Sequence, residues 1–382
     1  MTTIAGFVPS IVAAVWLILA QGHTLVRPIV LRVTSLESSG AGSLRQALDD
    51  GRPRIVVFEV GGVIDLHGNS LSVRNPHLTI AGQTAPDPGI TIIRGGLTIE
   101  TYDVIVQHIS ARLGDAGGVD DSLGARRAHD VLFDHCSATW AVDENLSVSG
   151  PADVDASRDP EATSHDVTLR SCLIAEGLMH ANHPKGAHSM GTLIHDGVRG
   201  IVIEGCLYAH NNERNPRLKG GSTARVIGNV MYDWGSACVG VGARGNQKML
   251  VPAEALLVDN VAIPGPSTTD RSFIKSLDVG GRLTMRDNIF VTGALRDKAR
   301  KTVEHVLRTA GARPAHRDPI DARIVQSVID RTGRIIDSQD QVGGYPLRAS
   351  TRRALVVPDD HREEWLRRLS DEVTAPSPSS RR

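Results

Sequence analysis

The sequence predicts an all-β fold, a right-handed parallel β-helix (β-solenoid) with an N-terminal capping helix and a partly helical C-terminal extension. The 382 residues include 38 glycines but only 3% aromatic residues, which indicates many turns around an aliphatic core. Short apolar segments, often β-branched and with period-two alternation, recur along the chain. They return at irregular intervals, as expected when each forms one strand of a coil and the loops between strands vary in length.

Seven of these segments align with one another. They begin at Val104, Val131, Val167, Ile201, Ala224, Ala255 and Leu283. One aligned position reads Ile109, Cys136, Cys172, Cys206, Asn229, Asn260 and Asn288. In a solenoid these positions lie one strand spacing apart, about 4.8 Å. We therefore predict a column of buried, reduced cysteines followed by asparagines whose amides hydrogen-bond from coil to coil. A globular β-sandwich is the competing fold, but it would not need this column.

Helical patterns flank the repeats, where an open coil would expose apolar surface. Ser43 and Gln46 form a capping box that predicts a short helix over the first coil. Residues 297–310 and about 318–328 carry apolar positions at helical spacing. The resulting segments are 1–24 (a signal peptide or apolar segment), 25–295 (the β-helix), 296–356 (helical and extended, packed on the β-helix) and 357–382 (a polar tail, disordered at its end).

The N-terminal segment favours secretion. Residues 4–20 form an uncharged apolar run of signal-peptide length, although Met-Thr-Thr before it lacks the usual basic residue. The run is short for a membrane span, and Pro9 interrupts it. A mis-assigned start and a buried segment are the alternatives. We expect a secreted monomer without a stable membrane partner.

The charge balance argues against nucleic-acid binding. There are 42 Lys and Arg residues against 43 Asp and Glu residues, a formal net charge of -1. Such a chain has no global basic field, so an anionic polymer would have to be bound by a local group of cations. The four cysteines lack the close pairs of a zinc site.

Two acidic loops are candidate metal ligands. Asp120 and Asp121 precede the strand that begins at Val131, and Asp143 and Glu144 follow one coil later. Loops of successive coils lie on one face, so these carboxylates could converge. Oxygen ligands on loops suit calcium, which takes six to eight of them. Solvated acidic side chains are the alternative.

A basic segment follows the strand at Ile201. Arg214, Arg217 and Lys219 place three cations within six residues, with Pro216 among them. A cationic loop facing an acidic loop across a groove is suited to an anionic sugar chain held by a metal. A solvated basic loop is the alternative.

Other residue groups are weaker candidates. His180, His183, His188 and His195 form a loose group without the spacing of a metal site, so we interpret them as substrate-lining or structural. Asp134 and His135 are adjacent in a strand, and we expect their side chains to point to opposite faces and to serve structure. Trp140 and Trp234 could stack on sugars or fill loops.

The chain resembles the pectate lyase family of parallel β-helix polysaccharide lyases, in particular its bacterial members, over roughly residues 33–347. Residues 131–136 (VLFDHC) are similar to the family strand that ends in Asp-His, and 214–219 (RNPRLK) to its R-x-P-x-x-R signature. Residues 61–65 (GGVID), 81–86 (AGQTAP) and 334–339 (RIIDSQ) resemble phrases common in bacterial members.

The resemblance implies that Arg214 removes the C5 proton of a uronate. Lys219 occupies the place of a second arginine that binds the substrate carboxylate. Lysine keeps the charge there but cannot form a bidentate pair. Lys185 lies near the position of a substrate-binding lysine, and Arg217 completes the expected set of substrate-binding cations.

For calcium, the resemblance implies ligands at Asp121, Asp143 and Ser147. Ser147 departs from the family pattern because it is not a carboxylate. Calcium would then bind more weakly, bind only with substrate, or use Glu144 instead.

These roles describe calcium-assisted β-elimination of pectate (polygalacturonate). An arginine base requires neighbouring cations and alkaline pH, so we expect an alkaline rate optimum. Two alternatives remain open: a β-helix glycoside hydrolase that uses paired carboxylates, and a carbohydrate-binding β-helix without activity.

Overall fold

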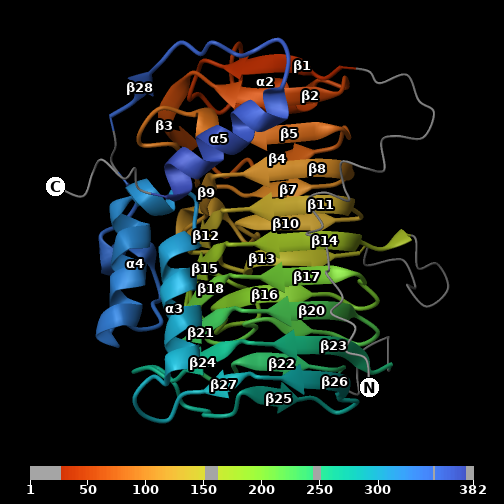
Figure 1. Ribbon diagram of the computed structural model, residues 1–382, viewed down its shortest axis with the longest axis vertical. Coiled ribbons are helices and arrows are strands. Elements are labelled where there is room, and N and C mark those ends of the chain that lie inside the picture. The colour runs from red at the N-terminus through yellow and green to blue at the C-terminus, as the bar shows by residue number, and fades with distance from the viewer. Residues whose placement is uncertain (1–26, 151–161, 244–250, 347–348, 376–382) are drawn as a thin grey trace, which may run out of the picture.

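The computed structural model describes residues 27–150, 162–243, 251–346 and 349–375. Its main body is a stack of coils, and each full coil contributes one strand to each of three sheets (Figure 1). Apart from β28, the strands pair in parallel with their equivalents in the neighbouring coils. The predicted parallel β-solenoid is confirmed. The apolar segment at residues 4–20 lies outside the described residues.

The first sheet has ten strands. In spatial order they are β1 (Ile29–Val33), β2 (Arg54–Phe58), β5 (Leu78–Ala81), β8 (Tyr102–Gln107), β11 (His129–Asp134), β14 (His165–Arg170), β17 (Ile201–Glu204), β20 (Thr223–Ile227), β23 (Ala253–Val258) and β26 (Gly281–Arg286). All seven aligned segments fall in this sheet as consecutive neighbours.

The second sheet carries the candidate site. Its eight strands are β4 (Leu71–Val73), β7 (Leu97–Ile99), β10 (Leu123–Arg126), β13 (Glu144–Ser149), β16 (Met190–Ile194), β19 (Arg217–Leu218), β22 (Val239–Val241) and β25 (Ile274–Ser276).

The third sheet again has ten strands. They are β28 (Thr351–Arg352), β3 (Val60–Asp65), β6 (Ile90–Ile93), β9 (Ile109–Arg112), β12 (Ser137–Thr139), β15 (Leu173–Ala175), β18 (Leu207–Ala209), β21 (Val230–Tyr232), β24 (Val261–Ile263) and β27 (Ile289–Phe290). The edge strand β28 is antiparallel to β3.

The predicted column of small and polar residues lies between the first and third sheets. Cys136, Cys172 and Cys206 are buried and form no disulfide. Below them, the Asn229 amide donates to Oδ1 of Asn260 at 2.9 Å, and Asn260 donates to Asn288 at 2.8 Å. The ladder satisfies polar groups that would otherwise be buried without partners, and it fixes the register of the lower coils.

The predicted helices are present. The helix α2 (Leu44–Asp49) begins after Ser43, whose hydroxyl accepts a hydrogen bond from the Gln46 amide. The helices α3 (Asp297–Thr309) and α4 (Pro319–Asp330) lie along the third sheet and bury their apolar faces there (Figure 1). The 3-10 turns are η2 (Gly82–Thr84), η3 (Asp115–Gly117), η5 (Pro314–His316) and η6 (Gln339–Val342).

The C-terminal segment departs from the expectation of a polar tail. Helix α5 (Arg362–Thr374) crosses the upper coils of the first sheet (Figure 1). Its Trp365 and Leu366 pack against Ile55, Val57 and Ala81. The segment forms a helix although most of its residues are polar, because α5 is amphipathic. Its four apolar side chains are Trp365, Leu366, Leu369 and Val373. In the part of the chain that the structure describes, no helix has the length and apolar character needed to span a bilayer.

Candidate functional site

The acidic residues of the two loops meet at one edge of the second sheet. Asp121 lies just before β10, and Asp143 and Glu144 lie at the start of β13, the neighbouring strand. Carboxylate oxygens of these three residues lie within 4.8 Å of one another. The backbone amide of Glu144 donates to Asp121 Oδ1 at 2.9 Å, which fixes the two loops relative to each other.

The crowding of carboxylates has an electrostatic effect on Asp121. Burial and the charges of Asp143 and Asp120 raise the pKa of Asp121 to about 8, although Ser147 and Arg214 act in the opposite direction. Placing several carboxylates together without a cation is unfavourable. A divalent cation would remove this cost, and hard oxygen donors are what calcium prefers. The residues therefore fit a calcium ion.

Ser147 takes part in the same cluster although it carries no charge. It lies on β13 beside Gly124 of β10, and its hydroxyl donates a hydrogen bond to Asp121 Oδ2. The position where the family pattern has a third carboxylate is thus occupied by a hydrogen-bond donor to the first.

Two buried histidines hold Asp143. Nε2 of His188 lies 2.8 Å and Nε2 of His183 lies 3.7 Å from Asp143 Oδ1, and the two imidazole rings stack with centroids 3.7 Å apart. Burial raises the pKa of Asp143, but the hydrogen bond from His188 and the nearby positive charges bring it below its ordinary value.

Asp143, His183 and His188 have ligand atoms close enough for a metal site of their own. However, Nδ1 of His183 accepts a hydrogen bond from the Lys185 amide at 3.1 Å. The proton of the neutral ring is therefore on Nε2, the atom that faces Asp143. His188 therefore donates to Asp143 at 2.8 Å, whereas His183 lies beyond hydrogen-bond distance and its Nε2 proton leaves that atom no lone pair for a metal. They were not predicted as its partners.

Arg214 lies against the acidic cluster. It precedes β19 in a left-handed backbone conformation (φ 65°), and its guanidinium forms an ion pair with Glu144. The two side chains are 14% and 6% exposed, so the pair is largely shielded from water. Arg214 also lies close enough to lower the pKa values of Asp121 and Asp143.

Lys219 and Arg217 are two further cations, both largely buried, that follow Arg214 along the chain. Lys219 Nζ pairs with Asp196 and donates to His195 Nε2 at 3.3 Å. Burial and the neighbouring arginines lower the pKa of Lys219, while Asp196 opposes that change. Arg217 is buried on β19, in register with Leu193 of β16. Asp196 was not identified from the sequence.

Lys185 is exposed in the loop before His188. Burial, the charge of His188 and, to a lesser extent, the charge of Lys185 lower the pKa of His183. Of the other histidines, His180 is exposed and pairs with Asp337, while His195 accepts a hydrogen bond from Lys219. The loose histidine group of the sequence thus divides among three separate environments.

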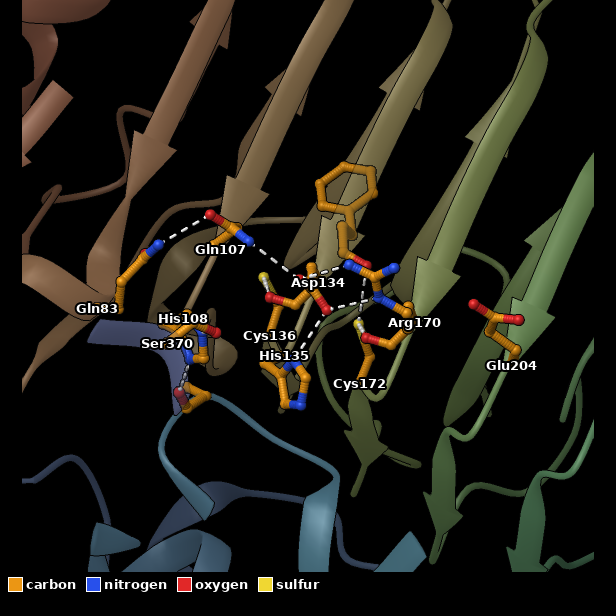
Figure 2. Close-up of polar contacts among 12 residues, drawn as sticks. Gln83, Gln107, His108, Asp134, His135, Cys136, Arg170, Cys172, Glu204 and Ser370 are labelled. Atoms are coloured by element: carbon orange, nitrogen blue, oxygen red, sulfur yellow. Dashed lines mark hydrogen bonds and ion pairs between the residues drawn. The ribbon is translucent and has the colours of Figure 1, made fainter. Parts of the chain in front are cut away.

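Asp134 and His135 form a separate network between the first sheet and α5 (Figure 2). Arg170 forms a bidentate pair with Asp134 at 3.0 and 2.8 Å, and Gln107 donates to it at 3.0 Å. His135 Nδ1 lies 2.8 Å from Asp134 Oδ1, so the expectation that the two side chains point to opposite faces is wrong. The strand ends at Asp134, and His135 turns back in the left-handed region (φ 50°).

Neither tryptophan forms an exposed platform for sugars. Trp140 and Trp234 are both buried, and their indole N–H groups donate to Glu176 and to the Asp270 carbonyl. Trp234 belongs to the main hydrophobic core, and Trp140 to the apolar cluster that also contains residues of α3 and α4.

Comparison with known proteins supports the resemblance found in the sequence. The chain is 35% identical over 245 residues to a protein named probable pectate lyase C from Aspergillus terreus, a match that covers 64% of this chain and 52% of that protein. The protein of the same name from Aspergillus fumigatus is 36% identical over 246 residues, with 64% and 51% covered. The chain is a homologue of these proteins. It spans about half the length of these curated relatives.

No family model matches the chain. Among solved structures, a pectate lyase bound to hexasaccharide superimposes with a TM-score of 0.48 at 12% identity, covering 74% of this chain and 91% of that one. Pectate lyase C from Erwinia chrysanthemi gives a TM-score of 0.47 at 14% identity, with 78% and 96% covered.

Proposed function

We propose that this chain is a secreted polysaccharide lyase that cleaves pectate-type uronic-acid polymers by calcium-assisted β-elimination. The observation that carries the proposal is the contact of Arg214 with an acidic cluster, together with two further cations that follow it. Asp121, Asp143 and Glu144 form the cluster, Arg214 pairs with Glu144, and Arg217 and Lys219 come after Arg214 along the chain. The homology to proteins named probable pectate lyase C supports the same reaction class.

In this proposal the cations bind the carboxylates of the polymer. Arg217 and Lys219 provide positive charge on β19 and directly after it. Asp196 and His195 restrict the position of the Lys219 ammonium, so that it meets the substrate with a defined orientation. Calcium, when bound by Asp121, Asp143 and Glu144, would stabilise negative charge that develops beside the uronate carboxylate.

Arg214 then acts as the base. Its neutral guanidine accepts the C5 proton, the electron pair of the C–H bond forms the C4–C5 double bond, and the C4–O bond breaks. The departing oxygen takes up a proton from solvent. No water is added, so the new non-reducing end is unsaturated. An arginine base implies faster turnover at alkaline pH.

The ion pair of Glu144 disfavours a glycoside hydrolase. Retaining and inverting hydrolases use two carboxyl groups that act on the sugar or on water. Here Glu144 pairs with Arg214 instead. A hydrolase would also leave the basic group without a role.

The test follows both product types during incubation with polygalacturonate at alkaline pH, with calcium and then with chelator. We expect ultraviolet absorbance to rise in proportion to new reducing ends, and only with calcium. Reducing ends without absorbance would identify a hydrolase. Binding without either product would identify a carbohydrate-binding protein.

A further inference from the structure

Glu144 pairs with one cation and belongs to a cluster that could hold another. Its side chain pairs with Arg214, and its carboxylate oxygen also belongs to the acidic cluster with Asp121 and Asp143. Only 6% of the side chain is exposed, so water does not supply an alternative partner. The guanidinium and a calcium ion in the cluster would therefore compete for the same carboxylate.

We propose that Glu144 is a positioning residue that holds Arg214 in the metal-free protein and turns to calcium when the ion binds. This inference rests on the proposed function. Calcium binding would release the Arg214 side chain from Glu144 so that it can turn toward the sugar. Metal binding and base placement would then be one coupled event.

The composition of the cluster explains why calcium needs Glu144. Ser147 offers a hydroxyl in place of a carboxylate, and that hydroxyl already donates to Asp121. Asp143 is held by hydrogen bonding to His188. Without Glu144, only two carboxylates of the cluster remain to neutralise the charge of the ion, and calcium affinity depends on the number of charged ligands.

Electrostatics explains why Arg214 would leave. A calcium ion held by Asp121 and Asp143 would repel the guanidinium, whose charge already acts on both carboxylates, and such repulsion is strong in a shielded site. Once Glu144 contacts the ion, the attraction that held Arg214 against the cluster is divided or lost. The predicted signature is a negative coupling between Arg214 and calcium that depends on Glu144.

A double-mutant cycle tests this coupling through calcium affinity rather than activity. Isothermal titration with calcium chloride, without substrate, is carried out on the full-length wild type, Glu144→Gln, Arg214→Gln and the double variant. We expect Arg214→Gln to tighten calcium binding about tenfold when Glu144 is present and by less than about threefold when residue 144 is glutamine. Lys219→Gln is the matched control, because Lys219 pairs with Asp196. Its effect should be the same in both backgrounds.

A second readout follows Arg214 directly. The ¹⁵N–¹H signal of its Nε group, assigned by its absence in Arg214→Gln, should shift on calcium addition in the wild type. In Glu144→Gln it should already resemble the calcium-bound wild type before calcium is added. Circular dichroism and thermal unfolding establish that each variant is folded.

The outcomes separate this inference from the proposed function. Equal tightening by Arg214→Gln in both backgrounds, or an Nε signal that ignores calcium, would overturn the role of Glu144 while leaving calcium binding intact. Absence of binding in all four proteins would overturn the calcium step of the proposed function and this inference with it.

Discussion

The hydroxyl of Ser147 donates a hydrogen bond to a carboxylate oxygen of Asp121 on the adjacent coil. In the family pattern that this chain resembles, the Ser147 position carries a carboxylate. The hydroxyl partly offsets the crowding of negative charge around Asp121. The Ser147 hydroxyl therefore stabilises the metal-free site, but because it is uncharged it does not help to neutralise a bound cation.

Restoring the carboxylate should strengthen calcium binding. Ser147→Asp adds a charged oxygen ligand to a cluster that already contains three carboxylates, so calcium affinity should rise about tenfold. The metal-free variant should lose stability because a hydrogen bond becomes a like-charge contact. Titration calorimetry measures the affinity, with Ser149→Asp two residues along β13 as the control for added charge. Unchanged affinity in Ser147→Asp would show that residue 147 does not face the ion.

Lys219→Arg should improve substrate binding. An arginine can pair with a uronate carboxylate through two parallel hydrogen bonds, which the ammonium cannot do. We expect KM for polygalacturonate to fall several-fold with kcat nearly unchanged, whereas Lys219→Gln should raise KM. Steady-state kinetics measures both constants. A rise in KM for Lys219→Arg would mean that the pairing with Asp196 requires the shape of lysine.

The buried His108 should make the fold sensitive to acid. Its ring contacts the Ala312 carbonyl and Ser370 at 2.7 Å each, and burial together with the charge of His135 lowers the His108 pKa to about 3. The unfolded chain binds a proton at this histidine below its ordinary pKa of 6.5, but the folded protein does not until about pH 3. Its contribution to stability is thus complete above pH 6.5 and decreases progressively down to about pH 3.

Denaturant unfolding at pH 7 and pH 5 tests this expectation. His108 should account for about 2 kcal/mol of the stability lost between these two values. His108→Gln has no group that titrates there, so it should be less stable at pH 7 but lose correspondingly less on acidification. The same loss in the variant and the wild type would show that other groups cause the acid sensitivity.

The asparagine ladder should be most sensitive at its centre. Asn260 donates to Val226 and Asn288 and accepts from the backbone and side-chain amides of Asn229. Asn260→Ala leaves several buried groups without partners, each of which costs roughly 1–3 kcal/mol. The half-buried Asn288 lies at the end of the ladder, so Asn288→Ala is the control and should cost less. Thermal unfolding compares the two, and equal losses would argue against a cooperative ladder.

Much of the fold could be predicted because each coil of the solenoid needs the same kinds of residue at equivalent positions, so the pattern recurs in the sequence. The column from Cys136 to Asn288 recurs because each coil places a residue at the same buried corner. Ser43 and Gln46 predicted the start of α2 because a capping box acts over only a few residues. Helix α5 was missed although Trp365, Leu366, Leu369 and Val373 carry the apolar spacing of an amphipathic helix.

The partners within the site were harder to predict. Asp121, Asp143 and Arg214 could be selected by residue type and motif, but the contacts of Glu144 with Arg214 and of Lys219 with Asp196 depend on how loops of unequal length fold over the coils. The hydrogen bond from His188 to Asp143 likewise depends on how the loops fold. The prediction that the side chains of Asp134 and His135 point to opposite faces was wrong for a different reason. Strand alternation no longer applies once the backbone turns at His135.

The most direct test of the account is the initial rate of ultraviolet absorbance with polygalacturonate and calcium at alkaline pH, compared between the wild type and Arg214→Ala. Arg282→Ala, which removes a 73% exposed arginine on the first sheet, is the control for loss of charge. The account predicts that Arg214→Ala loses at least about a hundredfold in rate, as expected for removal of a general base, while Arg282→Ala keeps the wild-type rate. A folded Arg214→Ala protein that forms unsaturated product at the wild-type rate would contradict the assignment of Arg214 as the base.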